Sequence, residues 1–320
     1  MGGVILTQIL LILFSCSVNI FAICTGYLYI NKKTINYKNI VSLMFICLFY
    51  NVLITSTSIF LSKSQGPRVM LNYLFPPFGN RHWYVTSYLI LFCCIPVLNK
   101  YFMELEKNAF RNFLILFFLL FSCCSMFSFH DLFFINWGYS FPWLIFCYLI
   151  GAYLKKYPIC YKTKRLLAVI IINLLIVFIS RLCIAKLTLR LLGKESHVNY
   201  FMQYISPFVL ENAICLVVLF SRITVTKDVS KKIIELLSIL SFDVYVIHAH
   251  PYVLDNFIYK KFNFIFQNSI IKTFVSIVIS IFSVYLVCSF IGLFRKSIFR
   301  LLKIDNLTKV LGDKLNHAFF

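Results

Sequence analysis

Residues 4–30 read VILTQILLILFSCSVNIFAICTGYLYI and contain no Asp, Glu, Lys or Arg. About 20 helical residues, rising ~1.5 Å each, cross the ~30 Å hydrocarbon core of a bilayer. The stretch is therefore long and apolar enough to form a membrane-spanning helix. A signal peptide would have a basic start and a small-residue cleavage site. The first basic residue here is Lys32, so we expect a span that is retained.

The same pattern recurs along the chain. Hydrophobic residues make up 61% of it and charged residues 13%, against roughly 45–50% and 25% in soluble domains. Eight further apolar stretches lie at 40–61, 83–98, 113–129, 137–154, 166–184, 204–220, 236–254 and 270–294. The sequence therefore predicts an all-α, polytopic transmembrane helix bundle of about nine spans, forming a single domain over residues 1–320.

The basic residues between these spans predict its orientation. If successive spans alternate in direction, five loops share one side, and they carry 21 of the 31 Lys and Arg residues. Basic residues stay on the cytoplasmic side of a membrane. We therefore expect the N-terminus outside and the C-terminus in the cytoplasm. The five loops are 31–38, 99–111, 155–165, 222–235 and 295–320.

The net charge of +20 has the same explanation. No basic run is long enough to form a folded face for nucleic acid, so we expect contact with anionic membrane lipid instead. The 12 cysteines lie mostly inside spans without metal-ligand spacing, so we expect no metal site and read them as small packing residues.

Ionisable residues inside membrane spans are costly and are therefore functional candidates. The topology places Arg181, Glu211 and His248 in the outer half of the membrane. Arg181 and Glu211 are expected to pair if their helices are neighbours, either as a structural ion pair or as part of a site. His248 is either a packed, hydrogen-bonded histidine or a catalytic group.

Two polar clusters lie at the predicted membrane surfaces. At the outer surface, Arg81 and His82 precede Trp83 and Tyr84, which an interfacial aromatic belt alone would explain. The cation and the imidazole add a candidate binding site for a substrate.

At the inner surface, the small residues of segment 24–26 precede Lys32, Lys33 and Lys38. A small-residue step allows close approach of a helix or ligand. The three lysines are either ordinary membrane anchors or a site for the phosphate groups of a cytosolic donor.

Four segments of the chain resemble known motifs. Residues 19–27, NIFAICTGY, resemble the string N-x-F-x-x-x-S-G-Y/F, with Thr25 in place of Ser. Residues 83–99 resemble W-Y/F-x-x-x-Y-L…P-x-x-N, and residues 241–248, SFDVYVIH, resemble S-F-G-x-Y-L-I-H. A fourth segment runs from WGYS at 137–140 to YLIGAY at 148–153. In this order, the segments resemble the acyltransferase 3 family, the integral membrane O-acyltransferases of bacterial surface polysaccharides.

The resemblance implies transfer of an acyl group, expected to be acetyl, from cytoplasmic acyl-CoA to a hydroxyl of a cell-surface or lipid-linked polysaccharide. It implies a multi-pass protein of the bacterial cytoplasmic membrane. The family has about ten helices, and its candidate base is a histidine in a helix preceding the one that opens this chain. We therefore expect a member that lacks the family's first transmembrane helix.

In such a member, His248 and His82 are the remaining imidazoles able to act as base or orienter. Arg181 and Glu211 are further candidate catalytic residues. Asn19, Arg81, Trp83 and Tyr84 are candidates for binding the acceptor, and Lys32, Lys33 and Lys38 for binding acyl-CoA. Two other functions remain open: a transporter or flippase of glycan intermediates, and an inactive assembly subunit of an envelope polysaccharide system.

Overall fold

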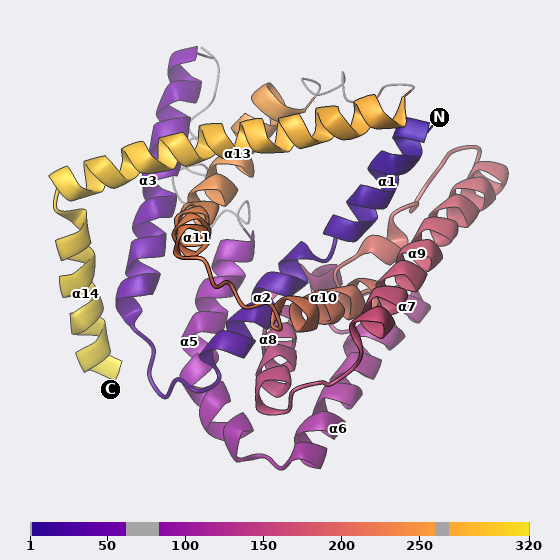
Figure 1. Ribbon diagram of the computed structural model, residues 1–320, viewed down its shortest axis with the longest axis horizontal. Coiled ribbons are helices and arrows are strands. Elements are labelled where there is room, and N and C mark those ends of the chain that lie inside the picture. The colour runs from indigo at the N-terminus through magenta and orange to yellow at the C-terminus, as the bar shows by residue number, and fades with distance from the viewer. Residues whose placement is uncertain (1, 62–82, 260–268, 320) are drawn as a thin grey trace. The chain divides into compact units, whose positions relative to one another are not determined.

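The computed structural model describes residues 2–61, 83–259 and 269–319, all in helices or in connections without strands (Figure 1). This confirms the predicted all-α polytopic class. The helices of at least ten residues are α1 (Gly2–Phe14), α2 (Ser17–Tyr29), α3 (Tyr37–Leu61), α5 (Trp83–Glu104), α6 (Lys107–Phe117), α8 (Phe141–Lys156), α9 (Thr163–Leu192), α10 (Pro207–Phe220), α11 (Asp228–His248), α13 (Ile270–Leu301) and α14 (Ile304–Phe319).

Seven segments within the described ranges are helical, long and apolar enough to cross a membrane. Three consist of consecutive helices: α1 with α2, α6 with η1 (Phe118–Cys124) and α7 (Ser125–Ser128), and η3 (Tyr200–Met202) with α10. An eighth forms if α11 is joined to the short helices α12 (Pro251–Val253) and η4 (Leu254–Ile258), which continue it after a bend of 72°.

The difference from nine spans comes from α8, the predicted span 137–154. It has 16 residues, about 24 Å at ~1.5 Å per residue, which is short of the ~30 Å hydrocarbon core. Most of its side chains are buried against neighbouring helices. An irregular segment at residues 129–140 leads into it.

The chain divides into two compact units, which are described separately. Unit 1 comprises residues 1–3, 35–89 and 224–320, and unit 2 comprises residues 4–34 and 90–223. Helix α5 contributes its first two turns to unit 1 and the remainder to unit 2.

Unit 2 is centred on close packing between α2 and α8. A Cβ at Gly26 would collide with the backbone carbonyl of Tyr148, and a Cβ at Gly151 would collide with the carbonyl of Ile23. The two helices therefore approach backbone to backbone, which only glycine allows at these two points. The small-residue step expected at segment 24–26 is thus a site of helix packing.

Residues near the beginning of α2 contact residues near the beginning of α8, and residues near the end of α2 contact residues near the end of α8. Trp143 Nε1 donates to Asn19 Oδ1 at 2.9 Å near their beginnings. Near their ends, Lys155 Nζ lies 4.8 Å from the ring centroid of Tyr27. The helices are therefore parallel, and α8 returns the chain to the end of unit 2 at which α2 finishes.

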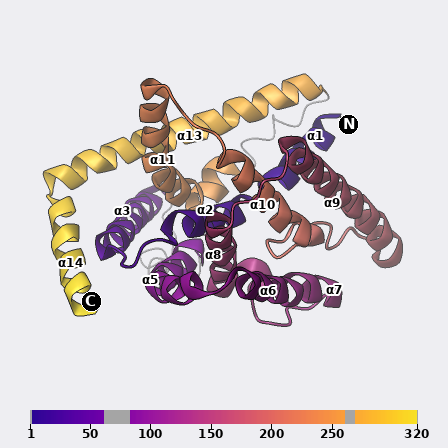
Figure 2. The ribbon, with the colours of Figure 1, turned by 60° about the horizontal axis from the view of Figure 1, so that its bottom comes forward.

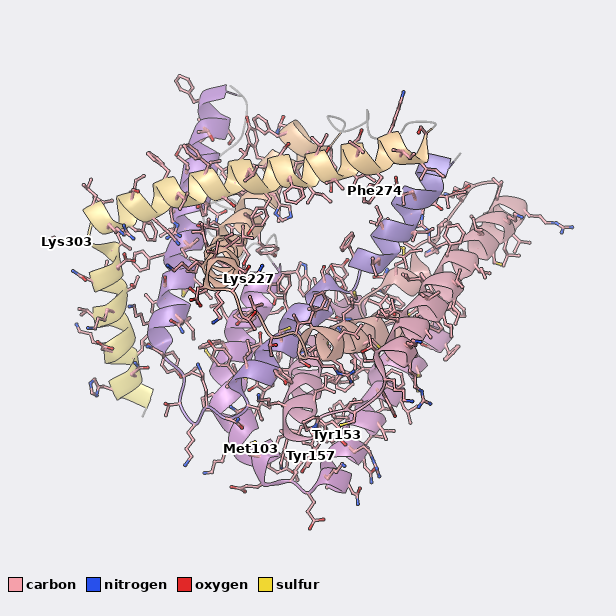
Figure 3. The ribbon with its side chains drawn as sticks, viewed as in Figure 1. Met103, Tyr153, Tyr157, Lys227, Phe274 and Lys303 are labelled. Atoms are coloured by element: carbon pink, nitrogen blue, oxygen red, sulfur yellow. The ribbon has the colours of Figure 1, made fainter. Side chains whose placement is uncertain are left out.

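Hydrogen bonds join four of the predicted basic loops or their boundaries at this end of unit 2. The donors are polar side chains and the acceptors are backbone carbonyls. Met103, one of the acceptors, is labelled at this end in Figure 3, together with Tyr153 and Tyr157. The bonds run from Asn99 Nδ2 to Lys32 (2.8 Å), from Lys156 Nζ to Met103 (2.7 Å) and Leu105 (2.8 Å), and from Arg222 Nη2 to Ile159 (3.0 Å). The sequence prediction that residues near 32, 105, 156 and 222 share a side therefore agrees with these contacts.

The irregular segment 129–140 lies at the opposite end of unit 2. Its turn includes Asn136 and Trp137, both with positive φ (47° and 55°). Asp131 holds it, since its carboxylate accepts from the backbone N–H of Asn136 at 2.7 Å. Tyr200 packs on the Trp137 ring at 5.6 Å and donates to the carbonyl of Met126 at 2.8 Å. Ile135 and Gly138 are buried within this segment, and its other side chains are partly or fully exposed.

Unit 1 contains α3, α11, α13 and the C-terminal helix α14. Helix α14 lies within the segment treated as a basic loop in the sequence, and it packs along the first turns of α3 (Figure 2). A Cβ at Gly312 would meet the backbone of Lys38, and Asn316 Oδ1 accepts from the Tyr37 N–H at 3.2 Å. Residues 35–38 and the C-terminal segment thus lie at the same end of unit 1.

Candidate active site

A cavity of about 650 Å³ lies within unit 1. Ligand sites commonly occupy ~300–1,000 Å³. Its walls come from α3, the end of α11, the bent segment α12–η4 and the middle of α13. The residues lining it are Tyr50, Leu53, Ile54, Thr57, Ile247, His248, Tyr252, Val253, Phe257, Ile258, Ser283, Val284, Val287, Cys288 and Ile291.

His248 is the only histidine among the described residues that line this cavity. Its Nδ1 lies 2.7 Å from the backbone carbonyl of Val244, one turn earlier in α11. A carbonyl oxygen can only accept, so Nδ1 carries the proton. In the neutral ring, Nε2 is then the unprotonated nitrogen and can act as a base.

Aromatic rings connect His248 to the predicted acceptor-binding residues at the start of α5. The ring centroids of His248 and Tyr245 are 6.2 Å apart, and those of Tyr245 and Tyr84 are 5.9 Å apart. Trp83 follows at 5.8 Å from Tyr84. The structure therefore brings together three of the predicted site residues: His248, Tyr84 and Trp83. Arg81 and His82 lie outside the described residues.

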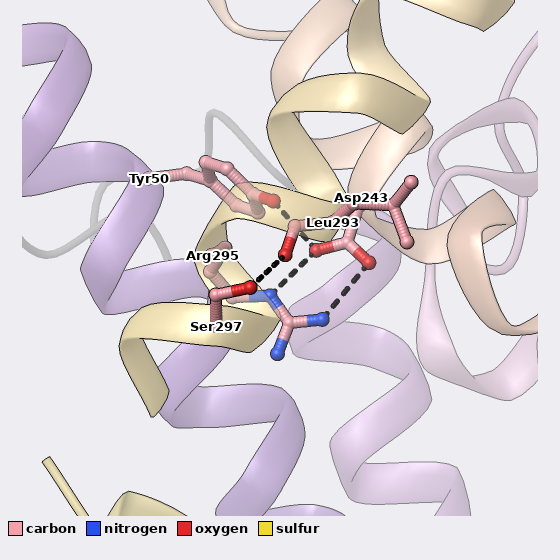
Figure 4. A network of polar contacts seen from close by, with 5 residues as sticks. All are labelled: Tyr50, Asp243, Leu293, Arg295 and Ser297. Atoms are coloured by element: carbon pink, nitrogen blue, oxygen red, sulfur yellow. Dashed lines mark hydrogen bonds and ion pairs between the residues drawn. The ribbon is translucent and has the colours of Figure 1, made fainter. Parts of the chain in front are cut away.

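A buried ion pair adjoins the cavity through Tyr50 (Figure 4). Arg295 contacts Asp243 twice, from Nε at 2.9 Å and from Nη2 at 3.1 Å. The Tyr50 hydroxyl donates to Asp243 Oδ1 at 2.6 Å. The side chains of Asp243 and Arg295 are only 1% and 7% exposed. The two-point contact and the phenol satisfy a carboxylate that would otherwise be costly to bury.

The ion pair depends on a glycine in α13. Asp243 occupies the position of Gly in the resembled string S-F-G-x-Y-L-I-H. Opposite it stands Gly292, where a Cβ would lie 3.0 Å from the Asp243 Cβ. The larger side chain in α11 is thus accommodated by the absence of one in α13, one turn before Arg295.

Sequence reasoning missed this network. Asp243 was visible as a charge inside a span, but Arg295 was assigned to the C-terminal loop, because the apolar run appeared to end at residue 294. The structure continues α13 to Leu301. A helical extension of the last span by one turn would have placed Arg295 within reach.

The expected ion pair between Arg181 and Glu211 is not formed in the described structure. In unit 2, Glu211 Oε2 accepts from Asn173 Nδ2 at 3.0 Å, and Arg181 Nη1 donates to the sulfur of Met202 at 3.2 Å. Arg181 follows Asn173 by eight residues on α9, about 12 Å at ~1.5 Å per residue. Glu211 therefore meets the amide at its own level, and the guanidinium lies beyond its reach.

Asn19 connects three segments of unit 2. It is fully buried, its Oδ1 accepts from Trp143, and its Nδ2 donates to the Tyr204 carbonyl at 2.9 Å. Its contacts are therefore those of a structural residue, and a substrate would have to displace them.

The three predicted donor lysines do not fall in one unit. Lys32 and Lys33 are exposed at the end of unit 2, and Lys32 Nζ lies 4.2 Å from the Tyr29 ring. Lys38 belongs to unit 1, beside α14. A second cavity, of about 410 Å³, lies in unit 2 at the ends of α8 and α10. Its lining includes Tyr27, which precedes Lys32 by five residues, together with Tyr161 and Arg222.

The fold and cavity define a multi-pass membrane protein with a histidine that lines a largely apolar cavity. The chain belongs to the acyltransferase 3 family, because the family's model, described as an acyltransferase domain, matches residues 2–293. The match includes α11, His248 and the whole cavity lining. No curated protein and no solved structure matches the chain.

Proposed function

We propose that the protein transfers an acyl group from acyl-CoA to a hydroxyl of a cell-surface or lipid-linked polysaccharide, with His248 as general base. The observation that carries this proposal is the bond from His248 Nδ1 to the Val244 carbonyl, which leaves Nε2 as the basic nitrogen of a histidine that lines a ligand-sized cavity. Family membership supplies the reaction class.

The proposed chemistry is a direct acyl transfer. The acceptor hydroxyl attacks the thioester carbonyl while Nε2 takes its proton, the C–S bond breaks, and the imidazolium returns the proton to the departing CoA thiolate. Trp83 and Tyr84, linked to His248 through Tyr245, are proposed to position the acceptor. Val244 positions the imidazole through its carbonyl.

The donor is proposed to approach from the end of unit 2 at which the basic loops meet. Lys32, Lys33 and Arg222 supply positive charge there for the phosphates of CoA, and Tyr27 and Tyr161 provide flat apolar surface beside Arg222. Lys38, which lies beside α14 in unit 1, is proposed for the same role. The five basic loops are assigned to the cytoplasm, because they carry 21 of the 31 Lys and Arg residues. The N-terminus would then lie outside a bacterial cytoplasmic membrane and the C-terminus inside.

Ester-linked acyl groups on purified surface polysaccharide test the proposal. Cells that express the protein are compared with cells that express His248→Gln, which keeps a polar side chain but has no base. The matched control is His317→Gln, on the exposed face of α14. We expect the ester content to fall at least about a hundredfold in His248→Gln, within the range general-base catalysis contributes, and to be unchanged in His317→Gln. Equal ester content in all three strains would contradict the assignment of His248.

Transport of a glycan intermediate is the second candidate, favoured by the 72° bend between α11 and α12, since broken helices form binding sites in transporters. A transporter would move the glycan without consuming acyl-CoA. Polysaccharide that reaches the surface only when the protein is present, with no ester groups, would favour this candidate.

A further inference from the structure

We propose that the unit 1 cavity holds the hydrocarbon chain of the transferred acyl group, so that the protein prefers donors with chains longer than acetyl. This inference rests on the proposed function and specifies its donor.

The lining of the cavity excludes polar occupants. None of its described residues is Lys, Arg, Asp or Glu. The Tyr50 hydroxyl donates to Asp243, and the Thr57 hydroxyl donates to the carbonyl of Ile54 at 2.8 Å. A sugar buried here would leave most of its hydroxyls unpaired, which is costly.

The dimensions of the cavity suit a chain rather than a methyl group. The lining residues extend from Tyr50 to Thr57 on α3 and from Ser283 to Ile291 on α13, about 10–12 Å along each helix at ~1.5 Å per residue. The methyl of an acetyl group would leave nearly all of the 650 Å³ without contacts. An alkyl chain would gain burial along the whole length.

The position of His248 decides which hydrocarbon belongs there. In the proposed reaction, Nε2 lies beside the hydroxyl that attacks the acyl carbonyl, so the chain nearest to His248 is the one bonded to that carbonyl. The prenyl chain of a lipid-linked acceptor is separated from its sugar hydroxyls by phosphate groups. The described cavity lining offers no cation for such phosphates.

A donor series on the purified full chain, reconstituted into liposomes with the surface polysaccharide of the producing cell, tests the inference. Release of CoA is measured by chromatography with acetyl-, hexanoyl-, octanoyl- and palmitoyl-CoA. We expect hexanoyl- or octanoyl-CoA to turn over at least about tenfold faster than acetyl-CoA, since one methylene in an apolar pocket already changes rates about 10–200-fold.

Two filling variants locate the chain. Val284→Phe adds bulk at a partly buried lining position and Val287→Phe adds it at an exposed one, so at least one is expected to fold. Either should lower the ratio of octanoyl to acetyl turnover at least about tenfold. The control, Leu286→Phe, changes an exposed residue of the same helix that does not line the cavity and should leave the ratio unchanged.

The outcomes distinguish failure of this inference from failure of the proposed function. Fast turnover of acetyl-CoA alone, with ratios that the filling variants do not change, would overturn the inference and leave the proposed function standing. The same holds if the cavity retains a membrane phospholipid that none of the donors displaces. No CoA release from any donor would overturn the proposed function, and the inference with it.

Discussion

Removal of the Arg295 guanidinium should destabilise unit 1 far more than removal of an exposed cation. The variant Arg295→Met keeps the length and packing of the side chain but leaves the Asp243 carboxylate with only Tyr50 as a partner. The Asp243 side chain is only 1% exposed. An uncompensated buried charge of this kind costs about 3–5 kcal/mol, roughly a hundred- to several-thousand-fold in the ratio of folded to unfolded protein.

Two companion variants separate charge from hydrogen bonding. Adding Asp243→Asn to Arg295→Met removes the buried charge while leaving an acceptor for the Tyr50 hydroxyl. The double variant should therefore recover at least about 2 kcal/mol of the loss. Tyr50→Phe removes one hydrogen bond to a charged group and should cost about 1.5–3 kcal/mol.

The assay is unfolding of the purified full chain in detergent micelles by added SDS, followed by circular dichroism. The matched control is Lys231→Met, which breaks the 3.3 Å ion pair between Lys231 and Asp228. The side chains of these two residues are 49% and 87% exposed. Exposed pairs contribute less than about 1 kcal/mol. If Arg295→Met were no more destabilising than Lys231→Met, the argument from burial would be refuted.

Three further predictions concern unit 2. Gly26→Leu should prevent accumulation of folded protein in membranes, because its side chain would collide with the Tyr148 carbonyl, whereas Leu28→Ala, at an exposed position of the same helix, should accumulate normally. Asn99→Leu should lower the free energy of unfolding by roughly 2–4 kcal/mol, because it leaves the Tyr29 and Lys32 carbonyls and the Tyr148 hydroxyl without this partner. Asn99→Asp should lose at least as much, because its buried carboxylate would face the two carbonyls with only the Tyr148 hydroxyl as a donor. The third prediction concerns membrane orientation and uses single cysteines introduced into a cysteine-free background. Cysteines at 105 and 156 should react with a membrane-impermeant maleimide only after the cells are opened, whereas a cysteine at 131 should react in intact cells. Labelling of position 156 from outside would reverse the proposed orientation.

Regular features of this fold could be predicted from the sequence because the bilayer imposes them. Length and hydropathy gave the all-α class, and the alternation of basic loops gave the grouping now seen in the contacts of Lys156 and Arg222. Helix α8 was predicted as an ordinary span, because its composition does not reveal that the chain enters it through the irregular segment 129–140. Its parallel packing on α2 depends on Gly26 and Gly151 meeting, which is a property of two helices at once.

The candidate site was likewise predictable in part from the sequence. His248 was found as an ionisable residue inside a span, and Trp83 and Tyr84, which connect to it through Tyr245, were found as interfacial aromatic residues. The pairing of charges was not predictable, because the sequence gives the depth of a residue but not the helix it faces. Arg181 and Glu211 share a predicted depth but have other partners. Asp243 and Arg295 pair because α13 is a turn longer than its apolar run and Gly292 makes room.

His248 is proposed to remove the proton from the acceptor hydroxyl in an acyl transfer from CoA. A single-turnover reaction of the purified protein in liposomes with hexanoyl-CoA and polysaccharide tests this role, with the acyl ester followed by mass spectrometry. We expect His248→Gln to bind the donor as the unsubstituted protein does but to form ester at least about a hundredfold more slowly, and His317→Gln to be unaffected. Ester formation at an unchanged rate in His248→Gln would contradict it.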